Sequence, residues 1–229
     1  MTSSDPSPGL APVRILVVED HPVVREGLAG LLEREGGFVV AGRAGSTREA
    51  RSLAPVCQPA IILLDLVLHE EDGLTLIGEL TTLAPAARVL VFSLQPEEIY
   101  AGRALRAGAH GYVLKSEPLP VLYSAIRTVA AGGIAVSPRI ATAALANLRG
   151  TTARHPTTSG TESALTDREL HVYRLTGLAL PTREIAEKLG ISVKTVEAHR
   201  ENIKNKLGLD THAALVARSA QWMQTAARG

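Results

Sequence analysis

The chain has 229 residues, a formal net charge of +1, and a composition of 45% hydrophobic and 3% aromatic residues. Its length exceeds that of a usual single domain and fits a unit of about 120 residues plus a smaller one. The single cysteine, Cys57, excludes an internal disulfide framework and a cysteine-based zinc site.

No apolar run reaches the roughly 18 to 20 residues that span a bilayer, and residues 1–12 lack the basic and apolar regions of a signal peptide. We therefore expect a cytoplasmic protein with no membrane partner. Residues 1–12 are expected to be a short disordered tail.

Residues 13–132 alternate five times between short apolar segments and helix-like segments. The apolar segments are rich in Val, Ile and Leu, as in strands covered on both faces, and span 13–18, 38–41, 60–64, 88–92 and 111–114. The helix-like segments span 22–35, 47–53, 74–83, 96–107 and 118–131. Strands joined by helical crossovers pair in parallel, so the pattern predicts a doubly wound α/β domain with a five-stranded parallel sheet.

Composition changes after residue 132, and residues 133–164 are expected to form a linker. Residues 137–148 are alanine-rich and can form a short helix, whereas 149–164 are dominated by Thr, Ser, Gly, Pro and Arg and cannot bury enough apolar surface to become ordered.

Residues 165–229 are expected to form a small all-α domain of four helices. A capping box of Thr166 and Glu169 opens the first helix, and Ser192 can cap the third. The short glycine-containing turn between the second helix, 182–189, and the third, which runs to residue 207, is typical of a helix-turn-helix. The fourth helix is expected over 212–223.

The two domains differ in charge. Residues 14–132 carry 11 Lys and Arg against 14 Asp and Glu, and residues 165–229 carry 10 against 7. The asymmetry favours a divalent cation in the first domain and a polyanion for the second, although a solvated charged surface gives the same counts.

Polar side chains follow four of the predicted strands where each strand ends. They are Glu19 and Asp20, then Asp65, Ser93 and Lys115. The carboxyl ends of parallel strands meet at one edge of a sheet, so we expect these side chains to converge. Carboxylates supply oxygen ligands for Mg²⁺, while a hydroxyl and an ammonium can hold phosphoryl oxygens. Turn capping by the aspartate and a solvated lysine are the simpler alternatives.

The third helix of the second domain has one apolar face and one polar face. Val196, Ile203 and Leu207 fall within about 40° of one another and predict the buried stripe. On the far side lie Lys194, Glu197, Ala198 and Glu201, which would face the bases in the major groove of DNA if this is a recognition helix. Phosphate-contacting positions on the two shoulders are Thr195, Asn202 and Lys206, and Arg200 and Lys204. An amphipathic helix with a solvated charged face has the same periodicity.

Two groups of motifs resemble known families. The stretches VVEDHPVVREGL, LLDLVLHEEDGL, VFSL and GYVLKS resemble the receiver domain of two-component response regulators. The stretches LTDREL and EIAEKLGISVKTVEAHRENIKNKLGL resemble the LuxR-type helix-turn-helix. In this order and spacing, residues 13 to about 223 resemble a NarL/FixJ-type response regulator.

The resemblance implies a role for each residue at the sheet edge. Asp65 would be the phosphoacceptor, and Lys115 and Ser93 would bind oxygens of the phosphoryl group. As Ser93 moves, Tyr112 would turn inward as a switch, with an ordinary core position as its alternative. The implied Mg²⁺ ligands are Glu19, Asp20, Asp65 and the backbone carbonyl of Val67.

The implied function is transcription regulation, not enzyme turnover. A sensor histidine kinase would phosphorylate Asp65 and so control homodimerisation and binding to double-stranded DNA. The fourth helix, with Leu215 and Trp222, would be the dimer surface, and a core position is the alternative for Trp222. Rival hypotheses are a phosphotransfer enzyme, disfavoured by the short loops, and an RNA-binding module, disfavoured by the few aromatics.

Four positions depart from the usual family pattern. His69 replaces a common proline and is expected to loosen the loop that holds Val67. Leu94 replaces a small residue, and we expect its bulk to slow phosphoryl entry. In the second domain Ala179 replaces a common glycine and Pro181 a common serine, although proline is tolerated in a first helical turn.

Overall fold

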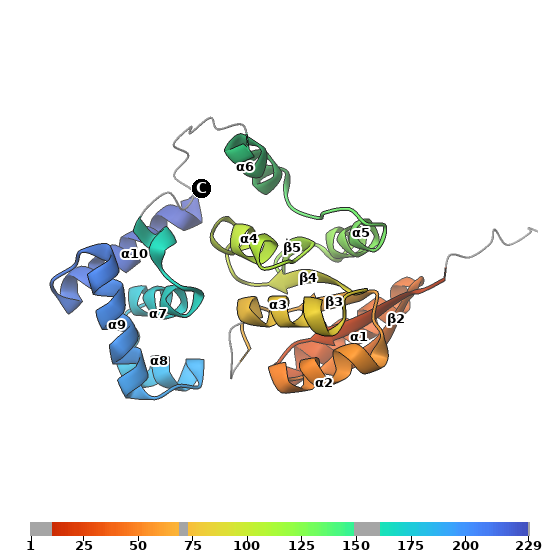
Figure 1. Ribbon diagram of the computed structural model, residues 1–229, viewed down its shortest axis with the longest axis horizontal. Helices are drawn as coiled ribbons and strands as arrows, with labels where there is room; N and C mark the ends of the chain where they lie inside the picture. Colours follow the sequence, from red (N-terminus) through yellow and green to blue (C-terminus); the bar gives the residue numbers. More distant parts are fainter. Residues whose placement is uncertain (1–10, 69–72, 149–160, 229) are drawn as a thin grey trace, which may run out of the picture.

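The computed structural model describes residues 11–68, 73–148 and 161–228. Figure 1 shows two bodies, an α/β body and an all-α body, joined through the chain between them. Among the described residues, no helix has both the length and the apolar character needed to cross a membrane. His69 falls outside the described residues, as does most of the tail predicted over 1–12.

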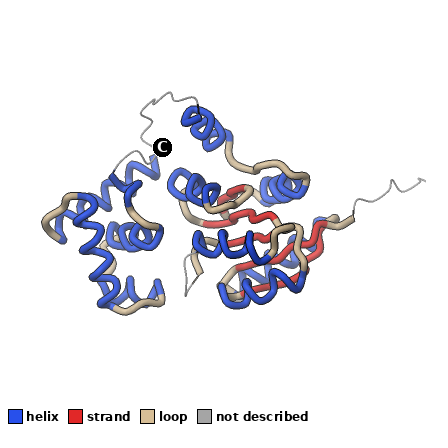
Figure 2. Tube along the Cα trace, viewed as in Figure 1, coloured by secondary structure: helices blue, strands red, loops and turns tan. Residues whose placement is uncertain are grey.

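A five-stranded parallel sheet forms the centre of the first body (Figure 2). Its strand order is β2-β1-β3-β4-β5, which confirms the predicted fold class. The strands are β1 (Val13–Val18), β2 (Phe38–Ala44), β3 (Ile61–Leu64), β4 (Arg88–Ser93) and β5 (Gly111–Leu114). Only β2 differs from the prediction by more than one residue, because it pairs with β1 through an irregularity between Ile15 and Leu16.

Alternate side chains of the strands enter two apolar cores, one on each face of the sheet. On one face, Ile15, Leu63 and Leu90 pack with residues of α1 (Pro22–Glu35) and α5 (Leu119–Ala130). On the other face, residues such as Leu16 and Leu64 pack with three helices: α2 (Thr47–Cys57), α3 (Gly73–Leu83) and α4 (Glu97–Arg106). The sheet is therefore covered on both sides, as its continuous apolar strands require.

Residues 133–137 form a strap along the free edge of β5. The N–H of Ala135 donates to the carbonyl of His110 (3.0 Å), and the N–H of Tyr112 donates to the carbonyl of Ala135 (2.8 Å). The helix α6 (Pro138–Leu148) follows and packs beside α4, where Arg139 pairs with Glu98 at 2.6 Å. The first part of the predicted linker is therefore attached to the sheet.

The all-α body consists of a short 3₁₀ turn, η1 (Thr161–Ala164), and four helices. They are α7 (Asp167–Gly177), α8 (Thr182–Leu189), α9 (Val193–Leu207) and α10 (His212–Arg228). The capping box is present: the N–H of Thr166 donates to Glu169 (2.7 Å), whose own N–H donates to the Thr166 hydroxyl (3.3 Å). Ser192 caps α9, as predicted, by accepting from the N–H of Thr195 at 3.1 Å.

The turn between α7 and α8 holds Ala179 at φ +55°. This left-handed conformation costs an L-residue with a Cβ roughly 1–2 kcal/mol, whereas glycine adopts it freely. Ala179, which replaces a glycine common in the family that the chain resembles, therefore occupies a position where glycine would be less strained.

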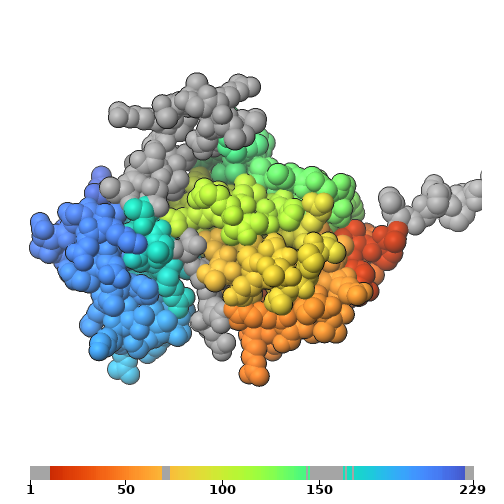
Figure 3. Space-filling view, in the orientation of Figure 1, coloured from red at the N-terminus to blue at the C-terminus, as the bar shows by residue number. Residues whose placement is uncertain are grey.

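The two bodies meet through α4 on one side and η1 and α7 on the other (Figure 3). The ring of Tyr100 stacks on the ring of His171, with centroids 5.6 Å apart and planes inclined at 30°. The guanidinium of Arg103 donates to the carbonyl oxygens of Leu165 (3.0 Å) and Glu162 (3.4 Å). An aromatic stack and an arginine clamp therefore fix this side of the boundary.

Candidate functional site

The polar residues at the strand ends converge at the carboxyl edge of the sheet. The ammonium of Lys115, after β5, donates to Asp65 Oδ2 at 2.6 Å and also contacts the carboxylate of Glu19, which follows β1. The hydroxyl of Ser93, at the end of β4, donates to Asp65 Oδ1 at 2.6 Å. Both oxygens of Asp65 are thus already bound to groups that can hold a phosphoryl oxygen.

This cluster is buried and carries an excess of negative charge. Glu19 is 2% exposed, Asp65 7% and Ser93 0%. Burial acts to lower the pKa of Lys115, but the adjacent carboxylates of Asp65 and Glu19 outweigh it and raise that pKa, so the side chain stays an ammonium. The ammonium of Lys115 balances only part of the charge of the carboxylates of Glu19, Asp20 and Asp65. Buried excess charge is costly unless a counter-ion neutralises it.

His21 joins the acidic cluster, although the sequence analysis did not select it. Its Nδ1 lies 2.8 Å from Asp20 Oδ1 and 3.2 Å from Glu19 Oε1. The charge of Asp20 is the main cause that raises the pKa of His21. The ligand-capable atoms of Glu19, Asp20 and His21 all lie within 4.8 Å of one another. Its position directly after two acids was the signal that could have revealed it.

The donor set fits a divalent cation through Glu19 and Asp20. Hard carboxylate oxygens are the ligands that Mg²⁺ prefers. Asp65 is not part of the group that gathers within 4.8 Å, and Lys115 bonds to both Asp65 and Glu19. The backbone N–H of Val67 donates to Asp65 Oδ1 at 3.2 Å, so the start of the loop after β3 lies against the side chain of Asp65.

Tyr112 already lies inside the first body. Its side chain is 2% exposed, and its hydroxyl donates to the carbonyl of Gln95 at 2.9 Å. Burial is the main cause that raises its pKa. Tyr112 thus lies inward while Ser93 is bound to Asp65, and the switch role that the resemblance implies stays a prediction. Leu94, between these groups, is 70% exposed and points away from the core.

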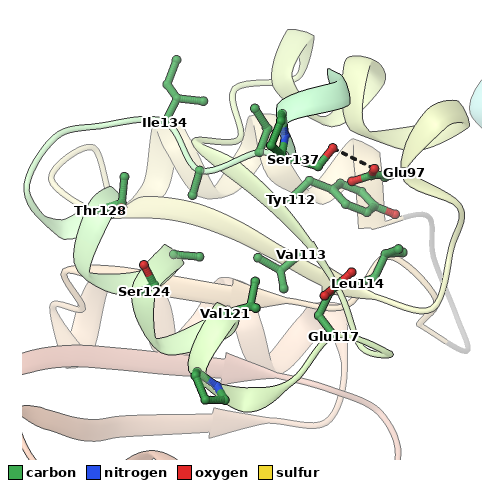
Figure 4. A pocket seen from close by; sticks show the side chains of 15 residues that line it. Glu97, Tyr112, Val113, Leu114, Glu117, Val121, Ser124, Thr128, Ile134 and Ser137 are labelled. Carbon is green, nitrogen blue, oxygen red and sulfur yellow. Dashed lines mark hydrogen bonds between the residues drawn. The ribbon is translucent and has the colours of Figure 1, made fainter. Parts of the chain in front are cut away.

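A groove of about 590 Å³ runs between the strap, β5 and α5, with Tyr112 on its wall (Figure 4). The hydroxyl of Ser137 in the strap donates to Glu97 of α4 at 2.8 Å, the contact drawn as a dashed line. The strap thus touches both the strand that carries Tyr112 and the helix that follows Ser93.

The polar face of α9 is open to solvent. All four predicted base-facing residues are exposed, and so are the three on one shoulder: Lys194, Glu197, Ala198, Glu201, Thr195, Asn202 and Lys206. On the flanks, Lys204 pairs with Glu201 at 2.8 Å, and Lys206 pairs with Glu169 at 2.6 Å. The predicted stripe of Val196, Ile203 and Leu207 is buried.

The position of Arg200 is not the one expected from its residue type. It is 9% exposed and donates to the hydroxyls of Thr176 (3.2 Å) and Thr182 (2.7 Å) and to the carbonyl of Leu180 (3.4 Å). Its guanidinium therefore ties α9 to α7 and α8 and is not presented to a phosphate. We correct its assignment from phosphate contact to internal brace.

Two apolar side chains of α10 also pack in the interior of the all-α body. Leu215 is fully buried, and Trp222 packs on Tyr173 with ring centroids 5.3 Å apart. The core alternative for Trp222 matches this packing. A dimer surface on this helix would have to use its exposed residues.

Comparison with known proteins identifies the family. The model of the response regulator receiver domain matches residues 15–127, and that of the luxR family of bacterial regulatory proteins matches residues 163–219. Over 206 residues, the chain is 33% identical to the oxygen regulatory protein NreC of Staphylococcus carnosus (strain TM300), covering 89% of this chain and 95% of that protein. The chain belongs to the LuxR family of two-component response regulators.

Other relatives agree with this assignment. The fimbriae Z protein of Salmonella typhimurium is 30% identical over 207 residues, which cover 90% of this chain and 96% of that protein. A crystal structure of a LuxR-family response regulator from Aurantimonas sp. is 38% identical, with a TM-score of 0.54, over 57% of this chain and 94% of that one. RcsB from Salmonella enterica, solved on promoter rprA, shares the fold at 22% identity and a TM-score of 0.57, over 91% of this chain and 98% of that one.

This response regulator therefore combines a receiver domain with a LuxR-type DNA-binding domain and acts in transcription regulation.

Proposed function

We propose that Asp65 accepts a phosphoryl group from a sensor histidine kinase and that this event controls dimerisation and DNA binding. The single observation that carries the proposal is the contact of Lys115 and Ser93 with the two oxygens of Asp65 inside a buried acidic cluster. An ammonium and a hydroxyl are groups that can bind phosphoryl oxygens, which supports the proposal. The protein would act in the cytoplasm as a regulator, without substrate turnover.

Glu19 and Asp20 would hold Mg²⁺ here, together with Asp65 and the carbonyl of Val67. When bound, the ion would supply positive charge to neutralise the phosphoryl oxygens. A carboxylate oxygen of Asp65 forms the new O–P bond while the P–N bond to the donor histidine breaks, and the imidazole nitrogen leaves with the electron pair. The ammonium of Lys115 and the hydroxyl of Ser93 then bind oxygens of the phosphoryl group instead of the carboxylate.

The same contacts provide a path for the signal. The N–H of Gln95 lies 3.4 Å from the Ser93 hydroxyl, and the Gln95 carbonyl accepts from Tyr112. A shift of Ser93 towards the phosphoryl group would therefore alter the chain that leads into α4. Two residues of α4, Tyr100 and Arg103, contact the DNA-binding domain. This is a physically connected route of the kind that links a local charge change to a two-state surface.

For DNA reading we propose the exposed face of α9. Lys194 can donate to guanine, Glu197 and Glu201 can accept from cytosine, and Ala198 can contact a thymine methyl. Thr195, Asn202, Lys204 and Lys206 would contact the phosphates, the two lysines after exchanging their present acidic partners. Two copies on half-sites one helical turn apart reach affinities on the order of 10 nM or better, which is why dimerisation matters.

The test replaces Asp65 with Asn, which removes the nucleophilic charge at nearly unchanged volume. Mass spectrometry after incubation with acetyl phosphate and Mg²⁺ should show one added phosphoryl group in the wild type and none in Asp65→Asn. Genomic DNA fragments recovered by pull-down serve as ligands, with beryllium fluoride as the phosphoryl mimic. The mimic should raise the affinity of the wild type alone.

The matched control is Glu33→Gln, because Glu33 is an exposed acid on α1 that pairs with the partly exposed Arg43. It should behave as wild type in both assays. Phosphoryl uptake by Asp65→Asn would show that another residue is the acceptor. Unchanged DNA affinity of the phosphorylated wild type would instead indicate constitutive DNA binding.

A further inference from the structure

A cavity of about 220 Å³ lies at the boundary between the receiver and the DNA-binding domain. One wall comes from the receiver and includes Asp20, His21 and the loop from Leu66 to Leu68. The other comes from α7 and α8. Pockets for drug-sized ligands usually occupy roughly 300–1,000 Å³, so an occupant of this cavity must be small.

The wall from the DNA-binding domain is strongly basic. Arg168, Arg174 and Lys188 all line the cavity from that side. Against these three cations, the receiver wall contributes one carboxylate, that of Asp20, which is 4% exposed and already accepts from His21. The charge of the cavity thus favours an anion over a cation.

His171 supplies a second, independent sign of a missing ligand. Its side chain lines the cavity and is 6% exposed, and neither ring nitrogen has a hydrogen-bond partner among the described residues. A buried polar group without a partner costs free energy that a bound acceptor would recover. Burial, followed by the charges of Arg174, Arg168 and Arg103, lowers the pKa of His171 to about 4, so the ring is a neutral donor to an anion.

The remaining lining makes the cavity selective for a compact, highly charged ligand. Leu66, Leu68, Leu175 and Leu189 surround the polar groups. Apolar walls keep water away and strengthen each charge interaction inside. Arg168 is held in place by donating to the carbonyl of Leu189 at 2.6 Å.

We infer that this cavity binds a small phosphate-type oxyanion, held by Arg174, Lys188 and His171. All three donors belong to the DNA-binding domain, and the receiver closes the opposite wall. Tetrahedral oxyanions match arginine and lysine donors well. The same chemistry has two sources, free inorganic phosphate and the phosphoryl group on Asp65, and the inference commits to the free anion. It does not depend on phosphorylation of the receiver.

The experiment titrates the full chain with inorganic phosphate by calorimetry, against chloride at equal ionic strength. The wild type should bind phosphate saturably, and the ring resonances of His171 should shift over the same concentrations. The double variant Arg174→Gln, Lys188→Gln should bind at least tenfold more weakly, which corresponds to about 1.4 kcal/mol. Lys188→Gln alone, at an exposed position, should lose part of the affinity without any effect on folding.

The control is Arg183→Gln, since Arg183 lies on α8, is 85% exposed and is not part of the cavity lining. It should bind like the wild type. Asp65→Asn should also bind like the wild type, which separates the free anion from a phosphoryl group on the receiver. Binding lost in Asp65→Asn but kept in the double variant would place the anion at the phosphoacceptor and overturn the inference. Absence of saturable binding would overturn it as well.

Discussion

Replacing Arg200 with Met tests whether this arginine is a brace inside the DNA-binding domain. The substitution keeps an unbranched apolar stem and removes the guanidinium, which bonds to Thr176, Thr182 and the carbonyl of Leu180. Hydrogen bonds from a charged group contribute about 1.5–3 kcal/mol each. The bond to Leu180, at 3.4 Å, is too long to add much.

Part of this loss is recovered, because the charge of Arg200 no longer has to be buried. Burial lowers the pKa of this guanidinium, which shows that its charged form is destabilised by its surroundings. We therefore expect a net destabilisation of about 2–3 kcal/mol. For a domain of this size, each kcal/mol lowers the melting temperature by roughly 4–8 °C.

The chain itself provides the probe. Trp222 is the only tryptophan and packs on Tyr173 within the DNA-binding domain, so its fluorescence during urea unfolding reports on that domain. Arg183→Met is the control, because the side chain of Arg183 is 85% exposed and pairs with the exposed Glu187. If Arg200→Met were within about 0.5 kcal/mol of the wild type yet bound DNA more weakly, the brace would be refuted and a phosphate contact supported.

Three further substitutions probe other parts of the fold. Ala179→Gly should stabilise the DNA-binding domain by about 1 kcal/mol in the same assay, because it relieves the strain at φ +55°. Glu169→Gln should weaken the pH dependence of that domain's stability. Burial acts to raise the pKa of Glu169, but hydrogen bonds from Lys206 and Thr166 lower it overall, so the wild type loses stability as pH falls below 4.5 towards the folded-state pKa. Gly111→Ala should destabilise the receiver by about 1–3 kcal/mol and speed amide exchange at Ala135, since its Cβ would lie 2.5 Å from the Ala135 carbonyl oxygen.

Each of these predictions has an outcome that contradicts it. A less stable Ala179→Gly variant would show that chain entropy outweighs the backbone strain. Identical acid profiles for the wild type and Glu169→Gln would remove the role assigned to its carboxylate. For the strap, the control is Gly102→Ala, where the nearest atom is 3.6 Å away. Equal exchange at Ala135 in both glycine variants would mean that the strap does not depend on this close approach.

Apolar periodicity predicted the architecture because burial of alternate strand residues is a property of each segment alone. It located β1 and β5 to the residue, and the convergence of Asp65, Ser93 and Lys115 followed from parallel topology. Arg200 shows the limit of residue type. It lies about 40° from Val196 on α9, at the edge of the predicted buried stripe, yet its charge led to a surface assignment. The periodicity therefore indicated the burial of Arg200 better than its residue type did.

The contacts between the two domains could not be predicted from apolar periodicity. The stack of Tyr100 on His171 and the cavity beside it depend on how two separately folded bodies meet. No local pattern encodes that arrangement. The attachment of Ala135 to β5 was missed for a related reason, because a single bridging residue is too short to produce a strand signal.

The strap has a consequence for how the two domains find each other. Residues 133–137 are held against β5 and α4, so the connection that can set the separation of the two domains begins after α6, and twelve residues, 149–160, lie in sequence between that helix and η1. A covalent connection of this length keeps the local concentration of one domain around the other on the order of millimolar. The pair then stays closed when the dissociation constant between the separate domains lies below that concentration, and a tenfold weakening, about 1.4 kcal/mol, shifts the ratio of closed to open molecules by the same factor.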